Sequence, residues 1–98
     1  MIQSFADETT ADLFRERNSR PAQVVPHDIW PIVRRKLKML DVAARLDDLA
    51  VLPGNRLERL NLKGSQSHRH SIRVNEQYRV TFRWEQGHAH EVRVEDYH

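Results

Sequence analysis

The sequence predicts an α+β fold in which two N-terminal helices pack on one face of a mainly antiparallel sheet. Two observations predict it. Up to about residue 49, apolar residues recur at three- and four-residue steps, and after Gly54 they alternate with polar residues. The 98 residues contain no repeat and no linker, so residues 1–98 are expected to form a single domain.

The helical half is expected to follow a short opening strand at Met1–Phe5. Thr9 or Thr10 can cap a first helix, because a side-chain oxygen at that position accepts a hydrogen bond from a free amide of the first turn. This helix should run to about Arg17. Its buried stripe is expected to consist of Ala11, Leu13 and Phe14.

A second and longer helix is predicted from a cap at His27 or Asp28 to about Leu49. Pro31 fits its first turn, where the missing N–H breaks no helical hydrogen bond. The helical spacing gives the helix one apolar face, formed by Trp30, Val33, Leu37, Leu40 and Ala44.

Strands are predicted after the turn at Pro53-Gly54-Asn55. Asn75-Glu76 and Gln86-Gly87 are expected to form the two tight hairpin turns. The apolar positions of the strands are Leu57, Leu60 and Leu62; Ile72 and Val74; Tyr78, Val80, Phe82 and Trp84; and Val92 and Val94.

The alternation predicts a sheet with two different faces. If the apolar residues from Tyr78 to Trp84 face the helices, the residues that alternate with them, Arg79, Thr81 and Arg83, point to the other side. Arg73 joins them from the adjacent strand if Ile72 and Val74 also face inward. Between Arg56 and Arg83 the chain has seven basic residues against two acidic ones, whereas residues 1–50 are neutral. Such a local cationic surface favours a polyanionic partner, although a solvated strand face would give the same pattern.

The composition excludes several classes of protein. There is no cysteine, so disulfides, thiolate catalysis and sulfur-ligand zinc sites are excluded. No apolar stretch approaches the length of a membrane span, and the N-terminus lacks a signal-peptide pattern, so no membrane association is expected. These features are typical of a cytoplasmic protein.

Several motifs resemble the HigB toxins of the RelE superfamily, and together they cover nearly the whole chain. These motifs are Ile2-Gln3-Ser4-Phe5, the Arg35-Lys36-Leu37 to Ala43 stretch, Gly54-Asn55-Arg56-Leu57-Glu58-Arg59-Leu60, Ser71-Ile72-Arg73-Val74-Asn75-Glu76-Gln77-Tyr78-Arg79-Val80-Thr81-Phe82-Arg83-Trp84 and the terminal Asp96-Tyr97-His98.

The resemblance implies a RelE-like toxin that cuts messenger RNA in the ribosomal A site. It implies that the RNA 2′-hydroxyl acts as the internal nucleophile, with no metal and no cofactor. It also implies neutralisation by a HigA-type helix-turn-helix antitoxin encoded beside the toxin, with DNA contacted only through the toxin–antitoxin complex.

RNA cleavage through the 2′-oxygen needs a base, an acid and cations around the phosphate. The resemblance places the terminal histidine in the site, so His98 is the first candidate for proton transfer. Asp96, two residues earlier, could orient or polarise the site, and Tyr97 could stack on a base or hydrogen-bond near the phosphate. Glu58 is a weaker catalytic candidate, standing where some family members have a histidine.

Arginine suits phosphate because its guanidinium offers paired N–H donors. Arg79 is the expected phosphate-stabilising residue and Arg73 the next. The other expected RNA-contacting residues are Arg59, Lys63 and Arg83.

Two other interpretations are open. The chain could be an RNA- or antitoxin-binding relative that does not cleave; such a protein would keep its arginine face and tolerate the loss of His98. Alternatively, His68-Arg69-His70 and His88-Ala89-His90 could each chelate Zn²⁺ or Ni²⁺ through two imidazoles on one strand face, although no acidic ligand is fixed beside them.

Overall fold

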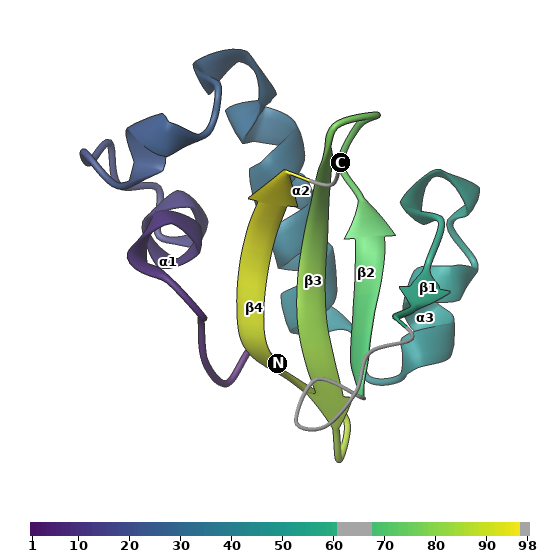
Figure 1. Cartoon of the computed structure of the whole chain (residues 1–98). Coiled ribbons are helices and arrows are strands. Elements are labelled where there is room, and N and C mark those ends of the chain that lie inside the picture. Colours follow the sequence, from purple (N-terminus) through teal and green to yellow (C-terminus); the bar gives the residue numbers. More distant parts are fainter. Residues whose placement is uncertain (61–67, 97–98) are drawn as a thin grey trace.

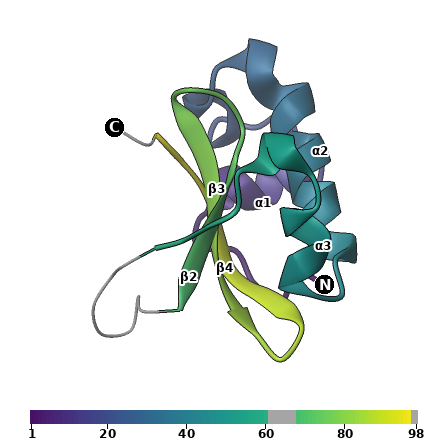
Figure 2. The same ribbon diagram turned by 90° about the vertical axis from the view of Figure 1, so that its right-hand side faces the viewer.

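A computed structural model describes residues 1–60 and 68–96 and confirms the α+β fold. Within these residues, three α-helices precede four antiparallel strands in the sheet order β1-β2-β3-β4. The helices lie on one face of the sheet, which Figure 2 shows from its edge. The elements are α1 (Glu8–Phe14), α2 (Trp30–Val42), α3 (Leu46–Ala50), β1 (Glu58–Arg59), β2 (Arg69–Arg73), β3 (Tyr78–Glu85) and β4 (His88–Asp96) (Figure 1).

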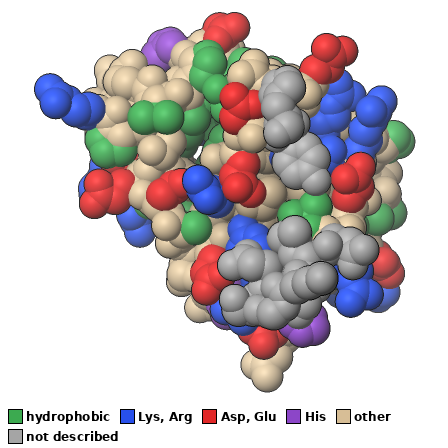
Figure 3. Space-filling view, viewed as in Figure 1, with side chains coloured by type: hydrophobic (Ala, Val, Ile, Leu, Met, Phe, Trp, Pro, Cys, Tyr) green, Lys and Arg blue, Asp and Glu red, His purple; other side chains and the backbone are tan. Residues whose placement is uncertain are grey.

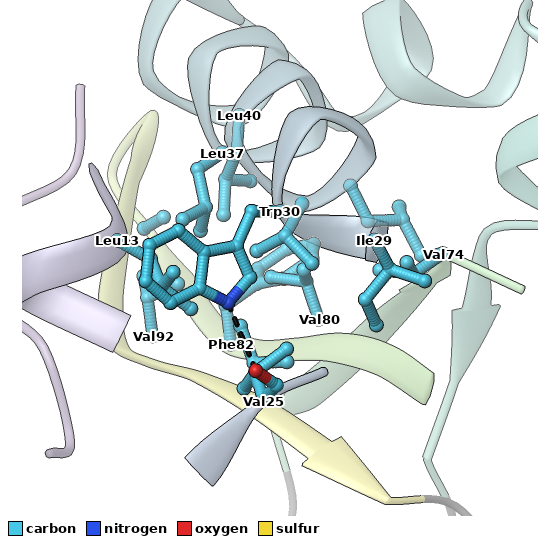
Figure 4. Close-up of a cluster of buried hydrophobic side chains, with 14 of the residues drawn as sticks. Leu13, Val25, Ile29, Trp30, Leu37, Leu40, Val74, Val80, Phe82 and Val92 are labelled. Carbon is cyan, nitrogen blue, oxygen red and sulfur yellow. Dashed lines mark hydrogen bonds between the residues drawn. The ribbon is translucent and has the colours of Figure 1, made fainter. Parts of the chain in front are cut away.

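The core lies between α2 and the sheet, as the two periodicities predict. Val80 and Phe82 of β3 are completely buried against the predicted apolar face of α2. Trp30 joins this cluster, and its indole Nε1 donates to the Val25 carbonyl at 2.9 Å (Figure 4). A buried indole needs such an acceptor, because an unpaired donor would cost free energy on burial.

The predicted bounds of the first helix were wrong at both ends. Asp7, rather than a threonine, is the N-cap, and its carboxylate accepts from the Thr10 amide at 2.8 Å. Thr10 instead faces inward, where its hydroxyl accepts from the Val94 amide at 2.9 Å. The helix ends at Phe14, and Glu16 follows in the left-handed region at φ 58°.

The second helix also ends earlier than predicted. Helix α2 stops at Val42, and α3 begins at Leu46. The Asp48 carboxylate accepts from the backbone amides of Ala44 and Arg45 at 2.9 and 3.0 Å, which stabilises a new helix start there. Ala44, which was expected on the apolar face, is therefore exposed.

Both predicted hairpins are present, but only Gln86-Gly87 is a tight two-residue turn. The loop between β2 and β3 covers residues 74–77, and Asn75 Oδ1 accepts from the Gln77 and Tyr78 amides within it. Gln86 and Gly87 have φ values of 51° and 78°, the left-handed pair that a two-residue hairpin requires. The expected opening strand is reduced to two parallel bridges, Ile2 to Ala89 and Phe5 to Val92, along the outer edge of β4. Leu62 lies outside the described residues. Among those described, every helix is too short or too polar to span a bilayer.

Candidate nucleic-acid interface

The register of β2 and β3 places arginines directly opposite each other on the face away from the helices. Arg73 pairs with Arg79, and Arg69 pairs with Arg83. Like charges in directly opposite positions repel, so these pairs need either neighbouring carboxylates or an anionic ligand. The predicted arginine-bearing face therefore exists, and its two ends satisfy this need differently.

At the hairpin end, between β3 and β4, the arginines are paired internally. Arg83 contacts the carboxylates of Glu85 and Glu91, and Arg69 lies 3.7 Å from Glu91. A register shift in β4 and the left-handed backbone of Glu91, at φ 51°, occur beside these arginines. Figure 3 shows basic and acidic side chains intermixed on this face. The arginine-bearing face therefore also carries carboxylates, which neutralise its charge at this end.

Arg79 is buried, with 8% of its surface exposed, although the sequence pattern predicted an exposed strand position. Its Nε donates to Ser71 Oγ at 2.8 Å, and its Nη2 donates to the Arg56 carbonyl at 2.7 Å. The half-exposed Glu58 carboxylate lies 3.8 Å from its Nη1. The guanidinium is thus held in a fixed orientation by three neighbouring segments of the chain, which pre-organises its charge.

A pocket of about 360 Å³ lies at this end of the sheet. It is lined by three arginines, one acidic residue and one amide, namely Arg56, Arg73, Arg79, Glu76 and Asn75. Arg73 is half-buried, and no ion pair to it is found within residues 1–60 and 68–96. This excess of cations around one surface hollow suits an anionic ligand.

Arg56 is a pocket residue that the sequence analysis missed. It follows the 3-10 turn at Pro53–Asn55 and adopts the left-handed conformation, with φ 43° and ψ 56°. A non-glycine residue in this conformation is uncommon and marks a backbone that its surroundings constrain. The sequence placed Arg56 at the start of the basic segment and directly after the Pro53-Gly54-Asn55 turn, but neither pattern assigned it to the site.

A larger hollow of about 450 Å³ also opens on this face of the sheet. Arg69 and Arg93 line it together with Glu91 and Glu95, so its charges cancel. In addition, burial lowers the pKa of Arg69, although both glutamates oppose that shift. The smaller pocket, with its net positive charge, is therefore the better candidate for a phosphate.

The pocket gathers some of the predicted site residues and leaves others out. Arg73 and Arg79 line it, and Glu58 contacts Arg79. Arg59 pairs with His70, so the strand alternation turns it to the opposite face of the sheet. Arg83 lies on the same face as Arg79 but at the other end of β3, in ion pairs.

Asp96 ends β4 beside the start of β3, close to the turn between β2 and β3 (Figure 1). It pairs with Tyr78, and its carboxylate accepts from Gln77 Nε2 at 3.0 Å. Since Glu95 is the residue opposite Arg79, the alternation points Asp96 to the other face of the sheet. Lys63, Tyr97 and His98 lie outside the described residues.

The histidine pairs were considered as a metal site. Within the described part of the chain, no group of three metal-ligating side chains comes together. His70 packs on the Phe82 ring with the centroids 6.0 Å apart, and burial lowers the pKa of its imidazole. The described histidines therefore do not form a site of the kind that holds zinc.

Comparison with known proteins places the chain in a family. Residues 3–98 match the family described as "RelE-like toxin of type II toxin-antitoxin system HigB". The protein named Toxin HigB-1 from Vibrio cholerae is 47% identical over 62 residues, covering 61% of each chain. A Haemophilus influenzae protein is 36% identical over 59 residues, covering 60% of this chain and 56% of its own length. The chain thus spans about three fifths of the length of these curated relatives.

The fold has a solved counterpart in the YoeB–YefM complex from Staphylococcus aureus. One chain of that complex superposes with a TM-score of 0.56 at 14% identity, covering 100% of this chain and 98% of its own. At this identity the likeness shows the fold alone. The family match, which extends over almost the whole sequence, goes further: the protein belongs to the HigB family of RelE-like toxins of type II toxin–antitoxin systems.

Proposed function

We propose that the protein is a ribosome-dependent endoribonuclease that cuts messenger RNA in the A site without a metal ion. The observation that carries the proposal is the three-arginine pocket in a member of the HigB toxin family. The size and charge of this pocket suit one phosphodiester of an RNA strand. Pre-organised cations at that position would stabilise the extra negative charge that develops on the phosphate during attack by the 2′-oxygen.

Arg73 and Arg79 would act on the same phosphate from neighbouring strands. Arg79 is anchored by Ser71 and the Arg56 carbonyl, so it would supply a fixed charge at the pocket wall. Arg73 is more exposed, and it would bind the incoming phosphate directly. This division of roles predicts that loss of Arg73 weakens RNA binding, whereas loss of Arg79 also loosens the fold around the pocket.

Proton transfer requires two groups in this reaction. One accepts the proton of the 2′-hydroxyl as its oxygen attacks the phosphorus, and the other donates a proton to the departing 5′-oxygen. We assign His98 to one of these roles, since imidazole exchanges protons near neutral pH. The Glu58 carboxylate lies 3.8 Å from Arg79 Nη1, and this position supports Glu58 as the residue for the other role. Tyr97 would orient the nucleotide, whereas Asp96, which points to the other face of the sheet, would act only indirectly, by holding Gln77 beside the turn between β2 and β3.

The remaining proposed contacts are with messenger RNA, ribosomal RNA and an antitoxin. Arg59, Lys63 and Arg83 would touch phosphates of messenger or ribosomal RNA outside the pocket. A HigA-type antitoxin would silence the toxin, and DNA would be bound only by their complex. A toxin that acts on translating ribosomes would work in the cytoplasm.

Primer extension on a translated message after brief induction tests this function. We expect cuts inside codons with the wild type, few cuts with Arg73→Gln and none with His98→Ala. Arg17→Gln, at an exposed arginine of the helical layer, is the matched control and should cut like the wild type. Cuts that persist undiminished in His98→Ala would move the chemistry to another residue. The absence of cuts in the wild type would favour a non-catalytic binding protein.

A further inference from the structure

A buried polar pair lies outside the proposed mechanism. Lys36, in the middle of α2, is 8% exposed, and Asn55 is completely buried. The Lys36 ammonium donates to Asn55 Oδ1 at 2.5 Å. Lysine is rarely buried, and both burial and the neighbouring Arg35 lower its pKa. Two apolar side chains of similar size could fill this space, so packing alone does not explain the pair.

Asn55 connects three parts of the helical layer. Its Nδ2 donates to the Leu49 carbonyl of α3 at 3.2 Å, and its backbone amide donates to the Leu52 carbonyl at 2.9 Å. Its Oδ1 accepts from Lys36 of α2. These bonds hold the turn at Pro53–Asn55 against both helices. The position of the backbone immediately after the turn is therefore fixed.

Arg56 directly follows this turn and adopts the left-handed conformation. Its carbonyl accepts from Arg79 Nη2, and its side chain lines the pocket. A strained backbone conformation persists only where the surroundings hold it in place. Asn55 precedes Arg56 in the chain and supplies this constraint, because the buried Lys36 ammonium holds the Asn55 side chain in place.

We propose that Lys36 and Asn55 are positioning residues, which fix the 53–56 turn so that the Arg56 carbonyl orients the Arg79 guanidinium in the pocket. The path runs from Lys36 through Asn55 and the Arg56 carbonyl to Arg79. It connects the helical layer to the opposite face of the sheet. Its consequence for catalysis rests on the proposed RNA-cleaving function, but the orientation of Arg79 can be measured without RNA.

The test compares the single variants Lys36→Met and Asn55→Leu with the double variant. Each single change leaves a buried polar group without its partner, so both should lower the melting temperature. The double change replaces both partners with apolar groups and should restore the melting temperature to within about 5 °C of the wild type. Lys38→Met, at an exposed position of α2, is the matched control and should change nothing.

Two measurements then separate positioning from stability. The first is the Arg79 Nε–H resonance in ¹⁵N spectra, which reports the hydrogen bond to Ser71. The second is the affinity for a short RNA with 2′-O-methyl sugars, which cannot be cleaved through the 2′-oxygen. In the folded double variant, we expect the resonance to move or broaden and the RNA to bind about tenfold more weakly, corresponding to one charge-assisted hydrogen bond.

A stable double variant with the wild-type Arg79 resonance and RNA affinity would overturn the proposal, because the pair would then contribute only to folding. The single variant Lys36→Met covers the case in which the double variant does not fold. It removes the Lys36 bond to Asn55 and leaves the Asn55 bond to the Leu49 carbonyl, so the Arg79 resonance should move; an unchanged resonance there would also overturn the proposal. If the resonance responds as expected but the wild type binds no RNA, the proposed function fails and the positioning role stands.

Discussion

Replacing Arg79 with lysine tests how the candidate site is built. Arginine at this position makes two charge-assisted hydrogen bonds, to Ser71 Oγ at 2.8 Å and to the Arg56 carbonyl at 2.7 Å. A lysine keeps the charge, but its single ammonium cannot reproduce the spacing of the two guanidinium donors. One buried acceptor therefore loses its bond to a charged donor, and Ser71 is completely buried. The expected loss in free energy of unfolding is about 1.5–3 kcal/mol.

Urea unfolding, followed by circular dichroism, measures this loss directly. Arg59→Lys is the matched control, since Arg59 is exposed on the neighbouring strand β1 and should change the free energy by less than about 0.5 kcal/mol. RNA binding by Arg79→Lys should weaken as well, although the formal charge is unchanged. If Arg79→Lys is as stable as the control and binds RNA like the wild type, the two hydrogen bonds do not organise the site.

Three further outcomes follow from the described contacts. His70 has a lowered pKa, caused mainly by burial, so the unfolded chain binds more protons and stability should fall as the pH drops below about 6.5. His70→Phe should remove that part of the pH dependence in urea titrations, whereas the exposed control His68→Gln should keep it. Asp7→Ala should cost about 1 kcal/mol of stability through loss of the helix cap, and Asp7→Asn should retain most of it, as thermal unfolding would show. Arg73→Gln should reduce the salt dependence of RNA binding by about one unit of slope in fluorescence anisotropy, with little change in stability.

The fold was largely readable from the sequence because one face of each long element is buried. Alternation along β3 placed Val80 and Phe82 in the core correctly. The helix boundaries were harder to predict from the sequence. Asp48 ends the long helical pattern by capping a new helix, and an aspartate within a helical run carries no such signal by itself.

The candidate site could be predicted only in part. Periodicity indicates which face of the sheet a side chain occupies, but it does not indicate how deeply the side chain is buried or which residue lies opposite it on the next strand. Arg79 was placed on the correct face, but its burial depends on contacts with β1 and the preceding turn. The proximity of Glu58 follows from its pairing with Ser71, which no local pattern specifies. Arg56 and Lys36 were missed for the same reason, because their roles depend on a turn that packs across the sheet and helices.

In the proposed reaction, the pocket holds a phosphodiester while the adjacent 2′-oxygen attacks it. The most direct measurement uses ribosomes programmed with a message that carries a single 2′-deoxy sugar at the nucleotide before the cut in the A site. If the 2′-oxygen is the nucleophile, the purified toxin cuts the all-ribose message there and leaves the substituted bond intact, and Arg73→Gln slows cleavage of the all-ribose message. Cleavage at the 2′-deoxy position at the wild-type rate would contradict the proposed reaction.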